Sequence, residues 1–415
     1  MYIWRSNLKL MRVILFFLSI IVLSACTSSP KIYQFRGDNR DGVYNEENLL
    51  KEWPEEGPEL VWTIEGLGNG YGTPAITDDR IFLTGEIDSV ALLFALDHSG
   101  EMIWKKEFGL EWMVNYPGSR MTPTVVDDLL YVTSGVGDIA CYGTETGELM
   151  WSLNMLSDLN GKNNRFGLSQ SPLVDGDFVF CAPGGSDTNF VALDRFSGEI
   201  RWIGKGLGEF ATHCSPRMIE RGGRKVILTF SESSLIALDG SNGDLLWNME
   251  MDTLGMIYAN TPLVDGDYLY SVTGAGNFGI KLKLNEDASD YELIWKNKAL
   301  DNVHGGFIKL DNYLITNGYR KQYLKVTDTE TGQIVDSLRT GRGSLVYADD
   351  LLYLYNYRGF IHLIDLKEGK LEEISKFKVS AGSREHFAHL TIKDGVMYVR
   401  HGDTLMAYSI QAAEE

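Results

Sequence analysis

Short apolar runs separated by turn residues recur along most of this chain. Residues 171–180 contain two such runs on either side of Asp175-Gly176-Asp177, and residues 261–270 repeat the arrangement around Asp265-Gly266-Asp267. Runs of this length, rich in Val, Leu and aromatic residues and interrupted by Asp-Gly turns, indicate antiparallel β-hairpins. Acidic pairs at these turns could suggest calcium, but their recurrence at the same hairpin position favours turn hydrogen bonding.

A second shared block follows each hairpin and ends in tryptophan. Residues 193–202, 238–247 and 142–151 align without gaps, and in each of them a glycine lies four residues before the tryptophan. Such a glycine suits the positive φ of a tight turn between two strands. Six tryptophans mark this position, and two later copies keep the turn but not the ring: Trp62, Trp104, Trp151, Trp202, Trp247, Trp295, Asp336 and Glu373.

These markers predict an all-β fold, an eight-bladed β-propeller over residues 59–411. Neighbouring markers are 37 to 51 residues apart, which is the length of a four-stranded propeller blade. The first marker has no inner strands before it, and the C-terminus has inner strands without an outer one. We therefore expect Leu60–Ile64 to pair with Leu405–Ile410, because an open ring would expose two unpaired sheet edges.

The N-terminus has the pattern of an export signal. Three basic residues precede Val13–Leu23, an apolar run too short to span a bilayer as a helix. The run ends in Leu23-Ser24-Ala25-Cys26, which resembles the lipobox of bacterial lipoproteins. The alternative is an ordinary signal peptide followed by a chance cysteine. We expect residues 1–25 to be removed, and residues 26–58, here called the lead segment, to form a lipidated tether leading into the propeller.

The net charge limits the classes of partner that we expect, and the cysteine content bears on disulfide formation. Removal of residues 1–25 takes three of the 38 basic residues and leaves 35 against 57 acidic ones, a formal charge of −22. An acidic surface repels phosphate backbones, so nucleic acid is not expected as a partner, and we expect a monomer. Cys141, Cys181 and Cys214 are an odd number and none are adjacent. We expect them to be small buried residues in strands rather than disulfides.

The motif Asp-x-x-Thr/Ser-Gly-Glu-x-x-Trp resembles that of the PQQ-like β-propellers. This superfamily includes quinoprotein alcohol dehydrogenases, which hold pyrroloquinoline quinone (PQQ), and barrel-assembly lipoproteins of the BamB type. The resemblance covers residues 59–410 and implies the fold, whereas both functional branches share it. Residues 35–43 also resemble the opening of bacterial PQQ-like repeat proteins of unassigned role.

The residues that enter the innermost strands are the candidate binding site. Equivalent positions on radially arranged blades converge on the axis, so residues distant in sequence become neighbours there. The eight equivalent positions are Tyr71, Arg120, Ser169, His213, Ala259, His304, Arg342 and Phe387. The cationic or titratable residues Arg120, His213, His304 and Arg342 favour an anionic ligand or a carboxylate from a partner. The alternative is that these side chains bond loop carbonyls and fill the channel.

The function we expect is a non-catalytic scaffold or binding protein of the cell envelope, anchored by lipid on Cys26. Outer-membrane protein assembly, with the protein facing the periplasm and binding envelope proteins through its loops, is implied by the resemblance alone. A PQQ-dependent oxidoreductase is the alternative, and a binder of a small anionic or sugar ligand is a third. Neither a catalytic residue nor a metal site is predicted. Against the quinoprotein alternative stand the lack of an adjacent cysteine pair and of a Cys-x-x-Cys-His haem motif.

Replacement of Cys26 by Ser tests the anchor. Without the thiol no lipid can be attached, so we expect the variant in the soluble periplasmic fraction, while the unaltered protein sediments with membranes. Immunoblotting of fractions after a salt wash measures the distribution. A variant that stays with the membranes would show that Cys26 is not the anchor.

Overall fold

A computed structural model describes residues 30–251, 257–274 and 278–413. The predicted signal peptide and Cys26 lie outside these residues. The chain divides into two compact units, Met1–Lys31 and Ile32–Glu415. The second unit contains all the strands, and its described residues form no helix. Within the described ranges we find no helix with the length and apolarity needed to cross a bilayer.

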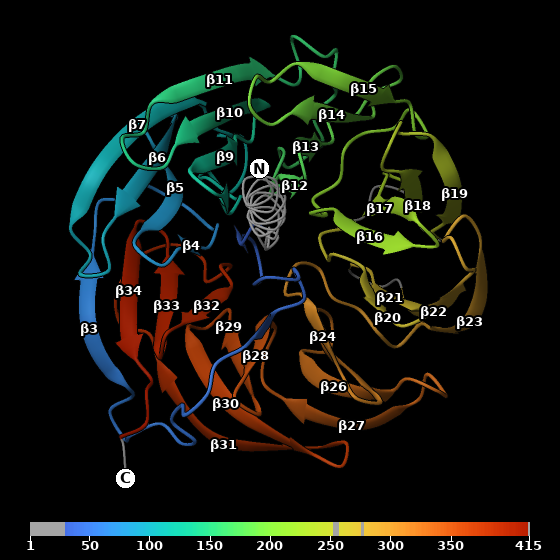
Figure 1. Cartoon of the computed structure of the whole chain (residues 1–415). Coiled ribbons are helices and arrows are strands. Elements are labelled where there is room, and N and C mark those ends of the chain that lie inside the picture. Colours follow the sequence, from blue (N-terminus) through green and yellow to red (C-terminus); the bar gives the residue numbers. More distant parts are fainter. Residues whose placement is uncertain (1–29, 252–256, 275–277, 414–415) are drawn as a thin grey trace, which may run out of the picture. The chain divides into compact units, whose positions relative to one another are not determined.

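Eight sheets form a ring, which confirms the predicted propeller (Figure 1). From the inner to the outer strand, blade 1 contains β4 (Ala75–Ile76), β5 (Ile81–Ile87), β6 (Val90–Leu96) and β7 (Met102–Leu110), and blade 2 contains β8 (Thr124–Val126), β9 (Leu129–Thr133), β10 (Asp138–Gly143) and β11 (Leu149–Asn154). Blade 3 contains β12 (Leu173–Asp175), β13 (Phe178–Cys181), β14 (Phe190–Asp194) and β15 (Ile200–Gly204), and blade 4 contains β16 (Arg217–Arg221), β17 (Arg224–Phe230), β18 (Ser234–Asp239) and β19 (Leu245–Glu250).

Blades 5 to 8 follow the same order. Blade 5 contains β20 (Leu263–Asp265), β21 (Tyr268–Val272), β22 (Gly279–Leu284) and β23 (Tyr291–Asn297), and blade 6 contains β24 (Phe307–Leu310), β25 (Tyr313–Asn317), β26 (Tyr323–Asp328) and β27 (Ile334–Arg339). Blade 7 contains β28 (Gly343–Ala348), β29 (Leu351–Asn356), β30 (Phe360–Lys367) and β31 (Lys370–Lys378), and blade 8 contains β32 (Leu390–Lys393), β33 (Val396–His401), β34 (Thr404–Ser409) and β3 (Glu59–Ile64). The middle strands are almost wholly buried, whereas the outer strands contain many exposed or partly buried residues.

The ring closes as the sequence predicts. In blade 8 the N-terminal strand β3 pairs antiparallel with β34, and Trp62 lies opposite Ala407. Figure 1 shows the blue β3 beside the red β34. This pairing completes the four-stranded sheet of blade 8, because its outer strand comes from the start of the chain.

Each marker tryptophan docks on the turn of the following blade. In blade 2, the Nε1 of Trp151 donates to the carbonyl of Arg195 at 2.9 Å. The turn glycine Gly198 has φ +74, and an added Cβ would lie 2.8 Å from the Trp151 ring. Four other indoles donate to a carbonyl of the next blade in the same way: Trp62, Trp104, Trp247 and Trp295. The indole of Trp202 is the exception, since its Nε1 is buried without a partner among the described residues.

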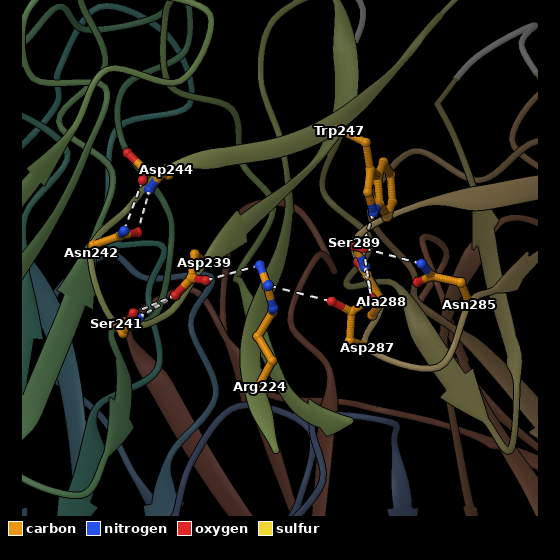
Figure 2. A network of polar contacts seen from close by, with 10 residues as sticks. All are labelled: Arg224, Asp239, Ser241, Asn242, Asp244, Trp247, Asn285, Asp287, Ala288 and Ser289. Atoms are coloured by element: carbon orange, nitrogen blue, oxygen red, sulfur yellow. Dashed lines mark hydrogen bonds and ion pairs between the residues drawn. The ribbon is translucent and has the colours of Figure 1, made fainter. Parts of the chain in front are cut away.

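Figure 2 shows this contact between blades 4 and 5. The Nε1 of Trp247 points at the carbonyl of Ala288, at 3.0 Å. Beside it, the guanidinium of Arg224 bridges Asp239 of its own blade and Asp287 of the next, at 3.2 and 3.3 Å. Half-exposed ion pairs of this kind contribute at most about 1 kcal/mol each, so the buried indole carries more of the contact.

The acidic turns between the two inner strands also join neighbouring blades. Asp175 of blade 3 pairs with Lys225 of blade 4 at 2.5 Å, and Asp127 of blade 2 pairs with Arg195 of blade 3 at 2.7 Å. Both carboxylates thus pair with a basic side chain of the next blade, whereas the sequence pattern predicted hydrogen bonds within the turn.

The marker assigned to blade 7 is wrong by two residues. In every blade the outer strand has a bulge directly before the marker position; in blade 7 that bulge lies at Ile374, so the equivalent residue is Ser375 rather than Glu373. The displacement arises because a two-residue turn joins β30 and β31, whereas the other blades use longer turns. The predicted marker Asp336 of blade 6 is correctly placed, and its carboxylate accepts the backbone N–H of Leu371 from the next blade.

A tryptophan of the lead segment occupies the docking position of blade 7. Trp53 is 4 % exposed, and its ring lies 5.7 Å from Tyr353 and 5.6 Å from Phe377. Its backbone N–H donates to the hydroxyl of Ser375. The blade without its own marker indole therefore receives one from a residue more than 300 positions away.

The lead segment is part of the propeller rather than only a tether. Its strand β1 (Ile32–Tyr33) pairs antiparallel with β8 of blade 2, and β2 (Val43–Tyr44) pairs in parallel with β28 of blade 7. Between them the chain runs through the centre of the ring, seen in blue in Figure 1. The propeller unit thus begins at Ile32, before the predicted boundary at residue 59.

The three later cysteines are free and buried, as expected. Cys141 lies in β10 and Cys181 in β13, but Cys214 precedes β16 and is not in a strand. The strand assignment of Cys214 was wrong because the segment before an inner strand is irregular here although it is buried.

Two glycines of blade 3 allow two effects to be measured separately, the cost of a left-handed φ and the cost of displacing an indole ring. Gly198→Ala has to adopt a left-handed φ, at a cost of roughly 1–2 kcal/mol, and also has to displace the indole of Trp151. We expect the free energy of unfolding to fall by about 3 kcal/mol in total. The matched control is Gly176→Ala, at φ +56 with open space around it, which should lose only about 1 kcal/mol. Urea unfolding measures both; equal losses would show that the glycine–indole contact does not stabilise the ring.

Candidate functional site

All eight residues that open the inner strands line one cavity on the axis, as the repeat register predicts. The cavity has a volume of about 310 Å³. Aromatic rings predominate in its wall, and the described lining residues include no Asp or Glu. Its lining includes Phe35, Tyr71, Tyr116, Arg120, Phe166, Ser169, His213, Ala259, His304, Tyr319, Arg342, Tyr357, Phe387 and His389. The four predicted site residues are therefore brought together; whether they bind a ligand is a separate question.

The lead segment closes one end of this cavity. Phe35 lines it, and the guanidinium groups of Arg36 and Arg40 reach outward to the blades on either side. Arg36 donates to the carbonyls of Phe307 and Leu345, at 3.0 and 2.9 Å. The sequence analysis singled out this stretch but did not place it in the channel.

Arg40 makes the corresponding contacts on the opposite side. It donates to the carbonyls of Ser171 and Pro216, at 3.2 and 3.0 Å, and also to that of Pro172. Burial lowers the pKa of Arg40 to about 9 and that of Arg36 to about 10. Each guanidinium bonds carbonyl oxygens of two neighbouring blades, and Arg36 also contacts the His389 ring at 3.0 Å, so both arginines act as structural links between blades.

Arg120 holds a loop in place. Its guanidinium donates to the carbonyls of Asn115 and Tyr116, at 2.6 and 2.7 Å, and to that of Gly118 at 3.3 Å. These three bonds fix the loop between β7 and β8 at the rim of the cavity. For Arg120 the structure thus favours the alternative in which the side chain bonds loop carbonyls.

Arg342 is different, because its guanidinium has neither a hydrogen-bond partner nor a carboxylate among the described residues. It lies over the rings of Tyr319 and Tyr357, 4.6 Å from each centroid. Two aromatic faces attract a cation without neutralising it. Arg342 therefore presents a positive charge to the cavity.

The two predicted histidines are neutral at physiological pH. Burial, with repulsion from Arg120, lowers the pKa of His213 to about 3. Burial, with repulsion from Arg342, lowers the pKa of His304 to about 4. His213 contacts the Ser169 hydroxyl at 2.8 Å, and His304 contacts the Tyr357 hydroxyl. They supply neutral hydrogen-bonding groups, so the positive charge of the site is carried by its arginines.

Sequence reasoning missed a buried carboxyl group behind the loop that Arg120 holds. Glu111 is 3 % exposed, and burial raises its pKa to about 7. One of its oxygens accepts the backbone N–H groups of Trp112 and Gly135, whereas the other has no partner among the described residues. Only the position of Glu111 at the end of an outer strand could have signalled it.

The residues present do not fit a metal-bound quinone. No group of three His, Cys, Asp or Glu side chains in the described chain is arranged to hold a metal ion. A calcium-bound quinone needs carboxylate or carbonyl oxygens beside it, and the described lining offers no carboxylate. The three cysteines are buried in or next to strands and none lines the cavity. What the arrangement can do is bind an anionic or aromatic group without a metal.

The ring of four-stranded blades and the axial cavity closed by the lead segment define a PQQ-like β-propeller. Residues 91–338, more than half of the chain, match the family described as outer membrane protein assembly factor BamB, and the chain belongs to that family. A relative of that name from Shewanella oneidensis is 23 % identical over 92 % of this chain and 94 % of its own length.

Solved structures show the same fold. The crystal structure of BamB from Moraxella catarrhalis aligns with 85 % of this chain and 99 % of its own, with TM-score 0.61 and 14 % identity. A quinohemoprotein alcohol dehydrogenase from Comamonas testosteroni aligns with 96 % of this chain and 83 % of its own, with TM-score 0.66 and 11 % identity. At these identities the likeness concerns the fold alone.

The neutral histidines make the fold sensitive to acid. Unfolded histidine has a pKa of about 6.5, so below that pH the unfolded chain binds protons that the folded state excludes, and stability falls as pH falls toward 4. His213 and His304 should each cost about 2 kcal/mol of unfolding free energy at pH 5 relative to pH 7.

Urea unfolding at both pH values measures this loss. His213→Asn with His304→Asn should remove about 4 kcal/mol of the loss, but not all of it, because the pKa of His386 and that of His389 are also lowered by burial. His98→Asn, on an exposed turn, serves as the control. An unchanged pH dependence in the double variant would contradict the assignment of neutral histidines.

Proposed function

We propose that this protein is a non-catalytic scaffold of the cell envelope that takes part in the assembly of outer membrane proteins. Its membership in the family of outer membrane protein assembly factors carries this proposal. Two relatives with that function in their names match 92 % and 79 % of the chain, so the resemblance is not confined to one blade motif.

The place of action that we propose is the periplasmic side of the outer membrane. The lipobox-like Leu23-Ser24-Ala25-Cys26 supports export and lipid attachment at Cys26. The family name supports the outer rather than the inner membrane. A lipid-anchored propeller would present its loops to other envelope proteins, and a monomer is sufficient for that role.

We also propose binding at the axial cavity, where the predicted residues Arg120, His213, His304 and Arg342 come together with different roles. Arg342 supplies the charge, the two histidines supply neutral polar groups, and Arg120 shapes the rim. The quinoprotein alternative has the fold in its favour, but the lining has no carboxylate to hold a calcium ion.

Purification from the envelope tests the proposal. Tagged full-length protein, solubilised from envelopes of the source organism, should retain components of the outer-membrane assembly machinery, and its depletion should lower outer membrane protein levels severalfold. With PQQ and calcium added, the protein should not reduce an acceptor dye. Quinone binding with electron transfer to an acceptor dye, together with normal outer membranes after depletion, would overturn the scaffold assignment in favour of an oxidoreductase.

A further inference from the structure

The open end of the cavity has an apolar rim. Outside the strands, five large apolar side chains in the described residues are exposed, and all but Phe196 lie in loops beside the cavity. Met113, Val114 and Tyr116 belong to the loop between β7 and β8, and Val114 is 77 % exposed. Phe210 lies in the loop between β15 and β16. Exposed apolar side chains concentrated beside a cavity are typical of interaction sites.

A groove continues the cavity toward this rim. Its volume is about 270 Å³, and it shares Phe166, His213 and Ile257 with the cavity. Phe210 lines it, and its charged residues are Arg165 and Glu232. The groove and cavity together lead from exposed apolar loops inward to the axis. A single-ring small molecule would fill only part of this space, whereas an extended chain could occupy it all.

Inside the cavity the positive charge of Arg342 is not neutralised. The described lining has no carboxylate, and the other end is closed by Phe35 and the buried arginines of the lead segment. A carboxylate entering from the open end would meet a guanidinium held between two tyrosine rings. Charge-assisted bonds of a guanidinium to a carboxylate are strong and directional.

We propose that the groove and cavity receive an extended segment of a partner protein, in which an apolar side chain lies next to an acidic residue. The apolar side chain packs against the rim and the aromatic wall, and the carboxylate pairs with Arg342. This proposal rests on the scaffold function above and names the chemistry of its partner. It also gives different roles to the two arginines: Arg342 recognises the segment, and Arg120 positions the rim loop.

Binding of a synthetic peptide tests the chemistry directly. The probe is fluorescein-Gly-Ser-Leu-Phe-Glu-Ser-amide, with a matched peptide that has Gln in place of Glu. On the unaltered full-length protein, fluorescence anisotropy should show at least tenfold tighter binding of the Glu peptide, and Arg342→Gln should remove that preference. Arg358→Gln, an exposed arginine beside Tyr357, is the control and should keep it. Equal affinities, or no binding of either peptide, would overturn the proposal.

Cross-linking in the envelope tests the natural partner. A photoreactive p-benzoylphenylalanine at position 114 should link to a partner segment that carries an Asp or Glu within a few residues of the linked site, and Arg342→Gln should abolish the link. The same group at position 335, on the exposed outer strand β27, is the control and should give no such product. Val114→Asp keeps the fold, because the side chain is exposed, and should weaken capture by repelling the acidic segment.

The two levels of failure are distinguishable. If the purification recovers envelope partners but position 114 links to none of them, and Arg342→Gln leaves recovery unchanged, the scaffold function stands and the inserted segment is wrong. A link from position 114 to lipid, to a second copy of this chain or to a segment without acidic residues also overturns the inserted segment.

Discussion

One contact recurs between neighbouring blades, the packing of a turn on the outer strand of the preceding blade. A propeller has no single core shared by all its sheets, so its cohesion is the sum of these neighbouring contacts together with the closure of the ring. The Trp151–Gly198 pair shows the usual chemistry, a ring against a glycine that lacks a Cβ, with the indole N–H bonded to a backbone carbonyl. The arrangement of residues around the axial cavity depends on this contact, because the spacing between blades sets the positions of the inner strands.

The two blades without a marker tryptophan show that the docking position must be filled, although the residue type can vary. In blade 6 the side chain at this position accepts a hydrogen bond instead of donating one, since the Asp336 carboxylate accepts an N–H from the next blade. In blade 7 the ring of Trp53 arrives from the lead segment. The Nε1 atoms of Trp53 and Trp202 are both buried without a partner among the described residues, which shows that packing alone suffices at two blades.

The features that recur in every blade could be predicted from the sequence. Each blade repeats the same spacing of inner strand, turn glycine and marker residue. This spacing predicts the blade count, the closure through Trp62 and the eight cavity positions. The roles of Arg36, Arg40 and Trp53 could not be found in this way, because the lead segment belongs to no repeat and its partners lie more than 100 residues away. Glu373 was misassigned for the complementary reason, since a shortened turn displaced the register where no tryptophan remained to reveal it. The bonds of Arg120 to loop carbonyls likewise depend on the conformation of a non-repeating loop.

The course of the lead segment also bears on the order of folding. Its residues leave the ribosome first, yet β2 pairs with β28 of blade 7, and β3, which follows the lead segment, pairs with β34 of blade 8. Contacts of such high sequence separation are costly to form until the intervening chain is compact. The middle blades can dock on one another as they emerge, but the ring is sealed only after the final strand has been synthesised. A chain arrested before that point would therefore expose both its inner channel and its two terminal strands, and exposed strand edges of this kind favour aggregation.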